Sequence, residues 1–209
     1  LTVNPVNDAP TIDLPESFTF EEDGYLIEDF SSYLYDLDQD ALTLSVSGNV
    51  NVTVSIVEFE VTFVSIQDWN GTETITFTVN DAQGRDIASD SIDVIVTPVN
   101  DAPEITVPEA QDTNEDIPLV LTLEATDVDE DDLIFSAYSA DPENVVAEVT
   151  GNQLTLSPVQ DWNGTVNIVV SVSDGELNDS EIFELTVNPV NDAPTIDLPE
   201  SFTFEEDGY

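Results

Sequence analysis

The chain repeats its own beginning at its end. The 25 residues Leu1–Tyr25 return letter for letter as Leu185–Tyr209. Shorter motifs recur at about half of that distance. "VNDAP" occurs three times and "QDWNGT" twice, at Val6–Pro10, Val99–Pro103, Val190–Pro194, Gln67–Thr72 and Gln160–Thr165. Because a fixed repeat period indicates structural units that follow one another, the sequence predicts a window of a longer array.

The spacing of these motifs also predicts where the units begin and end. Two homologous repeats are expected at residues 7–98 and 99–189. Residues 1–6 are predicted to be the last strand of a preceding repeat. Residues 190–209 are predicted to form a linker and the first strand of a following one. The larger period would then be a cassette of two unlike repeats.

Within each repeat, apolar and polar residues alternate over short segments, with Asn, Asp and Gly between them. The clearest segments are Ala41–Ser47, Thr74–Asn80, Ser91–Thr97, Asn167–Ser173 and Ile182–Asn188. A period of two over many short segments indicates an all-β fold. About seven strands in some 90 residues predict a Greek-key sandwich. Because a proline stands at each end of the linker "PVNDAP", two such sandwiches are expected to follow one another in a stiff rod.

The charge of the chain excludes several kinds of partner. It has 46 acidic residues against one basic residue, Arg85, and a net charge of -45. No nucleic acid is expected to bind, because its phosphates need Lys and Arg. Anionic membrane surfaces should repel the chain, and no apolar run is long enough for membrane insertion. The carboxylates must be kept apart, screened by salt or neutralised by cations.

The acidic residues recur in a pattern that suits calcium. The chain has no Cys and no His, so zinc, copper and haem iron lack their usual ligands. Calcium prefers oxygen ligands, about six to eight of them. "DLDQD" at Asp36–Asp40 and "DVDED" at Asp127–Asp131 each place three carboxylates on one short segment. These segments lack the Gly and Glu positions of an EF-hand loop.

At this point the repeats resemble a known family, the cadherin-like tandem repeats of large bacterial surface adhesins. "PVNDAP" is similar to the cadherin linker, "ATDVD" at Ala125–Asp129 to its Asp-x-Asp loop, and "VSVSDG" at Val170–Gly175 to its late Asp. The acidic "EED" and "NED" are similar to its early Glu. The linker is one residue shorter than in cadherins, and their L-D-R-E motif is absent. The resemblance implies cadherin/immunoglobulin-like sandwiches with fewer ions per junction than in true cadherins.

In that family Ca²⁺ lies between successive domains, and the resemblance implies the same here. The middle junction would use Glu22, Asp68, Asn100, Asp101, Asp127, Asp129 and Asp174. The front half-junction would keep Asn7, Asp8, Asp36, Asp38 and Asp81. The rear half-junction would keep Glu115, Asp161, Asn191 and Asp192.

The sequence therefore predicts a calcium-rigidified segment of an extracellular adhesin stalk or surface fibre on the cell surface. Its partners would be calcium and neighbouring repeats of the same or like chains. The alternative is a carbohydrate-binding β-sandwich that presents Trp69 or Trp162 to a glycan. No enzyme is expected, because the acids fall in repeated turns and no His, Lys or Cys is available as base or nucleophile.

Overall fold

The computed structural model describes residues 6–83, 87–106, 109–194, 196–198 and 206. The chain divides into two compact units, Leu1–Asn100 and Asp101–Tyr209. Most of the strand fragments predicted at the two ends lie outside the described residues.

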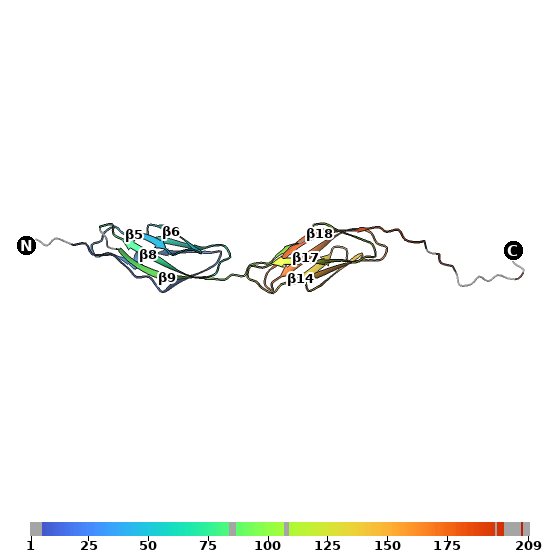
Figure 1. Cartoon of the computed structure of the whole chain (residues 1–209), viewed down its shortest axis with the longest axis horizontal. Coiled ribbons are helices and arrows are strands. Elements are labelled where there is room, and N and C mark those ends of the chain that lie inside the picture. Colours follow the sequence, from blue (N-terminus) through green and yellow to red (C-terminus); the bar gives the residue numbers. More distant parts are fainter. Residues whose placement is uncertain (1–5, 84–86, 107–108, 195, 199–205, 207–209) are drawn as a thin grey trace, which may run out of the picture. The chain divides into compact units, whose positions relative to one another are not determined.

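The first unit consists of two facing β-sheets. One sheet has four strands in the order β2 (Ser17–Glu21), β9 (Ile87–Thr97), β8 (Gly71–Asn80) and β5 (Thr43–Ser47). The other has three, β3 (Tyr25–Asp29), β7 (Glu60–Ser65) and β6 (Val52–Val57). A short pair, β1 (Thr11–Ile12) with β4 (Leu34–Tyr35), lies beside them, and one 3-10 turn covers Phe30–Tyr33. Strands β5, β8 and β9 are side by side in Figure 1.

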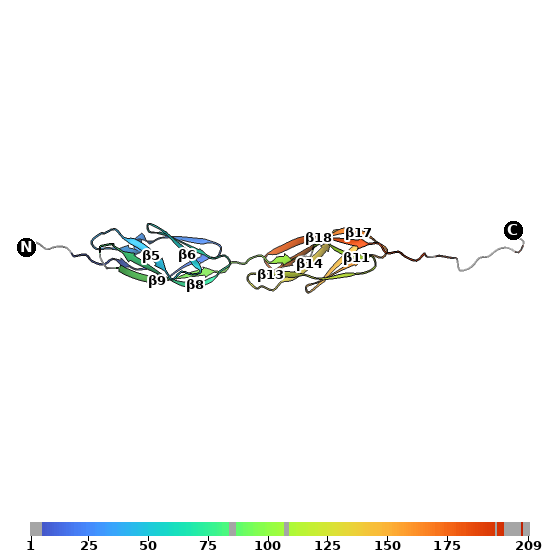
Figure 2. The same ribbon diagram turned by 45° about the horizontal axis from the view of Figure 1, so that its top comes forward.

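The second unit repeats this arrangement. Its four-stranded sheet has the order β11 (Gln111–Asn114), β18 (Asn178–Asn188), β17 (Gly164–Ser173) and β14 (Ile134–Ser139). Its three-stranded sheet has the order β12 (Leu119–Thr122), β16 (Gln153–Pro158) and β15 (Val145–Thr150), and β10 (Glu104–Thr106) pairs with β13 (Glu124–Thr126). Figure 2 shows β11 with β17 and β18 in this unit.

The all-β, Greek-key prediction is confirmed, but the first two strands of each sandwich are interrupted. In the first unit, β1 and β2 join different sheets, and β2 pairs with β9 in parallel. Pro15 lies in the break, where its missing N–H removes no ladder hydrogen bond. The second strand breaks between β3 and β4, where the Asp29 carboxylate accepts the N–H of Ser31 at 2.9 Å. No α-helix occurs in the described part of the chain.

Each sandwich has its own core. Alternate residues of β8 point inward, as the sequence predicted, and Ile75, Phe77 and Val79 are buried. The first core is aromatic: the ring of Phe30 lies 4.7 Å from that of Phe77, between centroids. The second core is mostly aliphatic: its buried residues are Ile, Leu and Val apart from Phe183, and Leu123 is fully buried. The two repeats thus share a fold and differ in how they fill it.

The tryptophan turns belong to this packing. Trp69 and Trp162 are half-buried, and each contacts the core of its own unit. Each indole ring also covers the glycine that follows two residues later. A Cβ added at Gly71 would lie 3.1 Å from the ring of Trp69, and one at Gly164 would lie 2.9 Å from that of Trp162. The close approach explains why glycine follows Trp-Asn in both repeats.

Replacing Gly164 by alanine is therefore expected to lower the free energy of unfolding of the second unit by about 1–3 kcal/mol, because the ring of Trp162 must move. Thermal unfolding followed by Trp fluorescence would measure the loss. Gly175→Ala is the matched control, since that glycine also has a positive φ, of 106°, but has open space where the Cβ would be. Equal losses in the two variants would show that the indole contact is unimportant.

Candidate metal centres

The loop after β4 brings three carboxylates together. Asp36, Asp38 and Asp40 each offer an oxygen atom, and these atoms lie within 4.8 Å of one another. Gln39, between the last two, has a φ of 60°, which turns the chain back toward its start. The N–H of Asp40 donates to Oδ1 of Asp36 at 3.1 Å. This local turn points alternate side chains toward one place.

The linker before the first sandwich joins this cluster. Asn7 donates from its side-chain amide to Oδ2 of Asp81 at 2.7 Å, and the N–H of Asp8 donates to Oδ2 of Asp38 at 2.8 Å. Asp81 is buried just after the end of β8. A hollow of about 310 Å³ beside the cluster is lined in part by Asn7, Asp38 and Asp40. All five residues of the predicted front group are thus brought together, with Asp40 in addition.

The second unit builds the same cluster. Oxygen atoms of Asp127, Asp129 and Asp131 lie within 4.8 Å of one another. The N–H groups of Asp129 and Asp131 donate to Oδ1 of Asp127 at 2.9 and 3.3 Å. The linker again takes part, since the N–H of Asp101 donates to Oδ2 of Asp129 at 2.8 Å. Asp174, after β17, accepts two backbone N–H groups at 2.7 Å with its Oδ1.

One oxygen in each cluster is buried without a hydrogen-bond donor. Oδ2 of Asp36 and Oδ2 of Asp127 have no partner among the described residues, and Asp36 is only 7% exposed. Glu73 is also buried, but its carboxylate accepts the N–H groups of Val50, Asn51 and Val52. A buried carboxylate oxygen without a donor is costly, and a cation would offset that cost. All the side-chain atoms that could bind a metal here are oxygens, which fits a hard divalent cation.

The pKa shifts of the clustered carboxyl groups agree with a preference for a bound cation. Burial, followed by repulsion from Asp36, Asp38 and Asp81, raises the pKa of Asp40. The pKa of Asp131 is raised by burial and then by repulsion, first from Asp127. In contrast, the amide of Asn7 and then the N–H of Gln83 lower the pKa of Asp81.

These shifts predict how stability depends on pH when divalent cations are removed. The raised pKa values of Asp40 and Asp131 mean that, at pH values above the ordinary aspartate value of 3.8, the folded chain binds more protons than the unfolded one. The melting temperature of the metal-free chain should therefore rise as the pH falls from 7 toward that value. Below it, the benefit ends and the contribution of Asp81, whose pKa is lowered, is lost.

Calcium should reverse this trend, because protons compete with the ion for the same oxygens. The measurement is a series of melting curves between pH 7 and 4, on decalcified protein and with calcium. The variant Asp40→Asn/Asp131→Asn should have a flatter metal-free profile. A metal-free melting temperature that falls between pH 7 and 5 would contradict the prediction.

Two buried glutamates hold the linkers that leave each unit. Glu22, 3% exposed, accepts the N–H of Val99 at 2.8 Å and lies 3.3 Å from the side-chain amide nitrogen of Asn70. Glu115, 4% exposed, accepts the N–H of Val190 at 2.5 Å. Both predicted residues thus lie where the sandwich passes into its linker.

Further carboxylates gather at this same end of the second unit. Asp116, Asp161 and Asp192 are exposed and offer oxygen atoms within 4.8 Å of one another. The N–H of Asp161 donates to Oδ1 of Asp116 at 3.1 Å. Burial and then repulsion, first from Asp161, raise the pKa of Asp192. Asn191, the other predicted linker residue, donates its side-chain amide to the backbone carbonyl of Asp192 at 3.1 Å.

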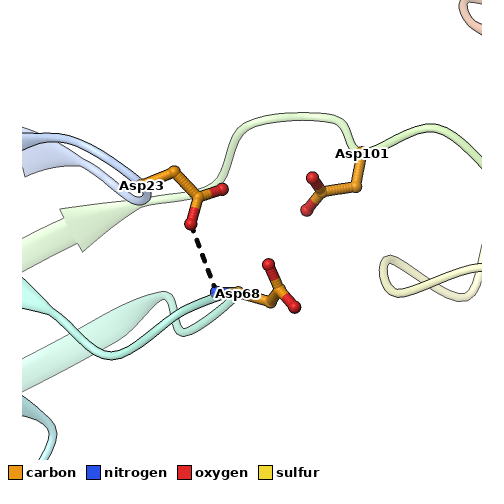
Figure 3. Close-up of side chains that lie close together, drawn as sticks. All are labelled: Asp23, Asp68 and Asp101. Carbon is orange, nitrogen blue, oxygen red and sulfur yellow. Dashed lines mark hydrogen bonds between the residues drawn. The ribbon is translucent and has the colours of Figure 1, made fainter.

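The first unit has the equivalent pair, Asp23 and Asp68, in which the N–H of Asp68 lies 3.4 Å from Oδ1 of Asp23. Figure 3 shows this pair together with Asp101, the linker residue that corresponds in sequence to Asp192. The sequence prediction did not include Asp23, Asp116, Asp40 or Asp131. Their signal was present as the last acid of "EED", "NED", "DLDQD" and "DVDED".

Two domain families match the chain. Residues 99–188 match a family described as cadherin-like domain, and residues 7–97 match bacterial Ig domain. The chain is a cadherin-like tandem repeat of the type found in bacterial surface proteins. Cadherin-like domains generally bind calcium, and cadherin-like and bacterial Ig domains are typical of extracellular or surface proteins and typically non-catalytic.

Solved structures agree on the fold of this cadherin-like repeat. Human protocadherin-24 EC1-2 is 18% identical, with a TM-score of 0.58 over 88% of this chain and 100% of that one. Drosophila N-cadherin EC1-4 gives the same identity and TM-score, over 88% of this chain and 50% of that one.

Another solved structure matches the chain with a lower TM-score. An endo-fucoidan hydrolase of glycoside hydrolase family 107 is also 18% identical, with a TM-score of 0.42. The match covers 91% of this chain but only 30% of the hydrolase. No curated protein matches. Within the described residues, no helix has the length and apolar character needed to cross a membrane.

Proposed function

We propose that this chain is a calcium-rigidified structural segment of an extracellular tandem-repeat adhesin stalk or surface fibre. The observation that carries the proposal is the buried, donor-free oxygen of Asp36 and of Asp127, each inside a cluster of three carboxylates. Hydrogen bonds from the rest of the protein compensate Glu73 but not these oxygens. A bound Ca²⁺ would compensate them and reduce the repulsion among their neighbours.

The proposed ligands follow the sandwich ends. At the front of the first repeat they are Asn7, Asp8, Asp36, Asp38, Asp40 and Asp81. At the middle junction they are Glu22, Asp68, Asn100, Asp101, Asp127, Asp129, Asp131 and Asp174. At the rear they are Glu115, Asp161, Asn191 and Asp192. The gathering of Asp192 with Asp116 and Asp161 in the second unit supports the use of a linker aspartate, and Asp101 would do the same after the first.

The role of the ion would be mechanical. Each linker is tied to a buried glutamate of the sandwich before it, through Val99 N–H to Glu22 and Val190 N–H to Glu115. The same linker is tied to the carboxylate cluster of the sandwich after it, as Asp101 N–H is to Asp129. An ion held by both sets would fix the angle between repeats, giving a stiff rod on the cell surface that spaces or assembles and does not catalyse. The repeat limits 7–98 and 99–189 are part of this proposal.

The carbohydrate-binding alternative based on Trp69 or Trp162 has less support. Both indole rings contact the core of their own unit and cover a glycine, so neither stands free as a platform.

Isothermal titration of the whole chain with Ca²⁺ tests the proposal. Binding is expected at about 10⁻⁴–10⁻³ M, the range of extracellular calcium modules. Asp127→Asn/Asp129→Asn should remove the middle site and leave the front one. Glu148→Gln/Glu184→Gln is the matched control, because it removes two exposed strand carboxylates of the same unit. Small-angle scattering should show a stiffer chain with calcium than with chelator. A full calcium stoichiometry in the aspartate variant, or identical scattering curves, would refute the proposal.

A further inference from the structure

The first unit has a groove beside the short β1–β4 pair that the calcium clusters do not use. Its volume is about 550 Å³, within the usual range for small-molecule sites. Polar, aromatic and aliphatic residues line it together, the aliphatic ones being Leu14 and Leu34. The lining includes Thr11, Asp13, Pro15, Ser32, Tyr33 and Tyr35.

The walls of the groove are held by hydrogen bonds. The N–H of Asp13 donates to the carbonyl of Tyr33 at 3.0 Å, and the N–H of Leu14 donates to Oδ2 of Asp90 at 2.8 Å. Tyr33 packs edge-on against Phe30 of the core, with ring centroids 5.6 Å apart. The groove is therefore largely preformed, which lowers the entropic cost of binding.

The polar groups of the groove are free for a ligand. In the described part of the chain, no hydrogen bond involves the carboxylate of Asp13, the hydroxyl of Ser32, or the phenol groups of Tyr33 and Tyr35. Tyr35 is 61% exposed, so its ring is accessible. One carboxylate alone is too few for a metal site. Aromatic rings beside unpaired hydroxyl and carboxylate groups suit a molecule that has an apolar face and a hydroxylated rim.

The charge of the chain further limits the class of ligand that this groove could bind. With no Lys or His in the sequence and a net charge of -45, the groove should repel phosphorylated, sulfated or uronic ligands. A quaternary ammonium would use the rings and the carboxylate but not the hydroxyl groups. We propose that this groove binds one neutral pyranose, with the C–H face of the sugar on a tyrosine ring and its hydroxyl groups on Asp13 and Ser32. This site is independent of calcium and goes beyond the proposed stalk function.

The second unit provides an internal comparison. A groove of about 450 Å³ lies at the equivalent β10–β13 pair and is lined in part by Thr106, Thr126 and Phe135. Thr126 takes the place of Tyr35, since Thr11 pairs with Tyr35 and Glu104 with Thr126. Phe135 is half-buried and packs against the core. With no exposed ring, the second groove is expected not to bind sugar.

Saturation-transfer NMR of the whole chain, with chelator present, tests the site. The probes are the methyl glycosides of glucose, galactose and N-acetylglucosamine, together with choline. For so small a ligand, a Kd of about 1–10 mM is expected for at least one sugar. Tyr35→Thr, which introduces the residue of the second unit, should weaken binding by tenfold or more, and Asp13→Asn should weaken it as well. Thr126→Ala is the matched control and should leave binding unchanged.

Three outcomes would overturn the proposal. The first is the absence of a signal from any of the sugars up to a ligand concentration of about 50 mM. The others are sugar binding that Tyr35→Thr leaves intact, and binding of choline alone. Melting curves of each variant show whether it is folded. Threonine is used at position 35 because the second unit has threonine at the equivalent position and still forms the strand pair. Calcium titration of the same samples keeps the two proposals separate, because loss of the sugar site leaves the carboxylate clusters unaffected.

Discussion

Saturating calcium is expected to raise the melting temperature of each sandwich by about 10–20 °C. A ligand present at 100 times its Kd stabilises the folded state by about 2.7 kcal/mol, and each kcal/mol moves the midpoint of a domain of this size by about 4–8 °C. The proposed binding sites would form only when the loops around Asp36 and Asp127 are folded and joined by their linkers. The ion would therefore stabilise the folded chain and not the unfolded one.

The variant Asp36→Asn/Asp127→Asn should separate the two effects of these carboxylates. With calcium, it should lose most of the stabilisation, because the ion loses a central ligand in each cluster. Without calcium, it should melt at a higher temperature than the unmodified chain, because each cluster loses the negative charge of a carboxylate whose buried Oδ2 has no hydrogen-bond donor.

The measurement is differential scanning calorimetry of both chains in chelator and in calcium at 100 times the measured Kd. Glu148→Gln/Glu184→Gln again serves as the control for a general loss of charge, and it should keep the full response to calcium. If the double aspartate variant responded to calcium as the unmodified chain does, these oxygens would not be ligands.

Phe30→Ala is expected to lower the free energy of unfolding of the first unit by about 3–5 kcal/mol, the usual cost of removing a buried aromatic ring. Phe30 is fully buried, and its ring lies within 6.3 Å of the rings of Phe18, Phe63, Phe77 and Tyr33, between centroids. Loss of the Phe30 ring would leave a cavity at the centre of this aromatic group, because an alanine side chain is too small to fill it.

The two tryptophans allow the effect to be assigned to one unit. Each unit has a single one, so urea unfolding of Phe30→Ala in a Trp162→Phe background reports on the first unit through Trp69. Leu123→Ala removes the fully buried leucine at the equivalent place in the second unit, and it should destabilise that unit alone. Ile27→Ala, at a residue that is 49% exposed, should cost less than about 0.5 kcal/mol. A Phe30→Ala cost no larger than that of Ile27→Ala would show that the aromatic core collapses without penalty.

The net charge of -45 and the folded sandwiches are compatible because of where the acids lie. Those with the closest neighbours sit in the loops and linkers at the sandwich ends, while the strands hide their apolar residues between the sheets. Repulsion is thus concentrated at the ends, which is where cations would have the largest effect on stability.

The sequence by itself determined the alternating strands, the repeated motifs and the abundance of carboxylates in the loops at the sandwich ends. Alternation in segments such as Thr74–Asn80 depends only on neighbouring residues, and the recurrence of "DLDQD" as "DVDED" needs no knowledge of space. The tertiary structure decided what lies far apart in sequence. Asn7 meets Asp81 across 74 positions, and the burial that leaves Oδ2 of Asp36 without a donor depends on how loops of one sandwich close over each other. Local patterns reveal which side chains are available, whereas only the packing of the sheets decides which of them meet and which lose water.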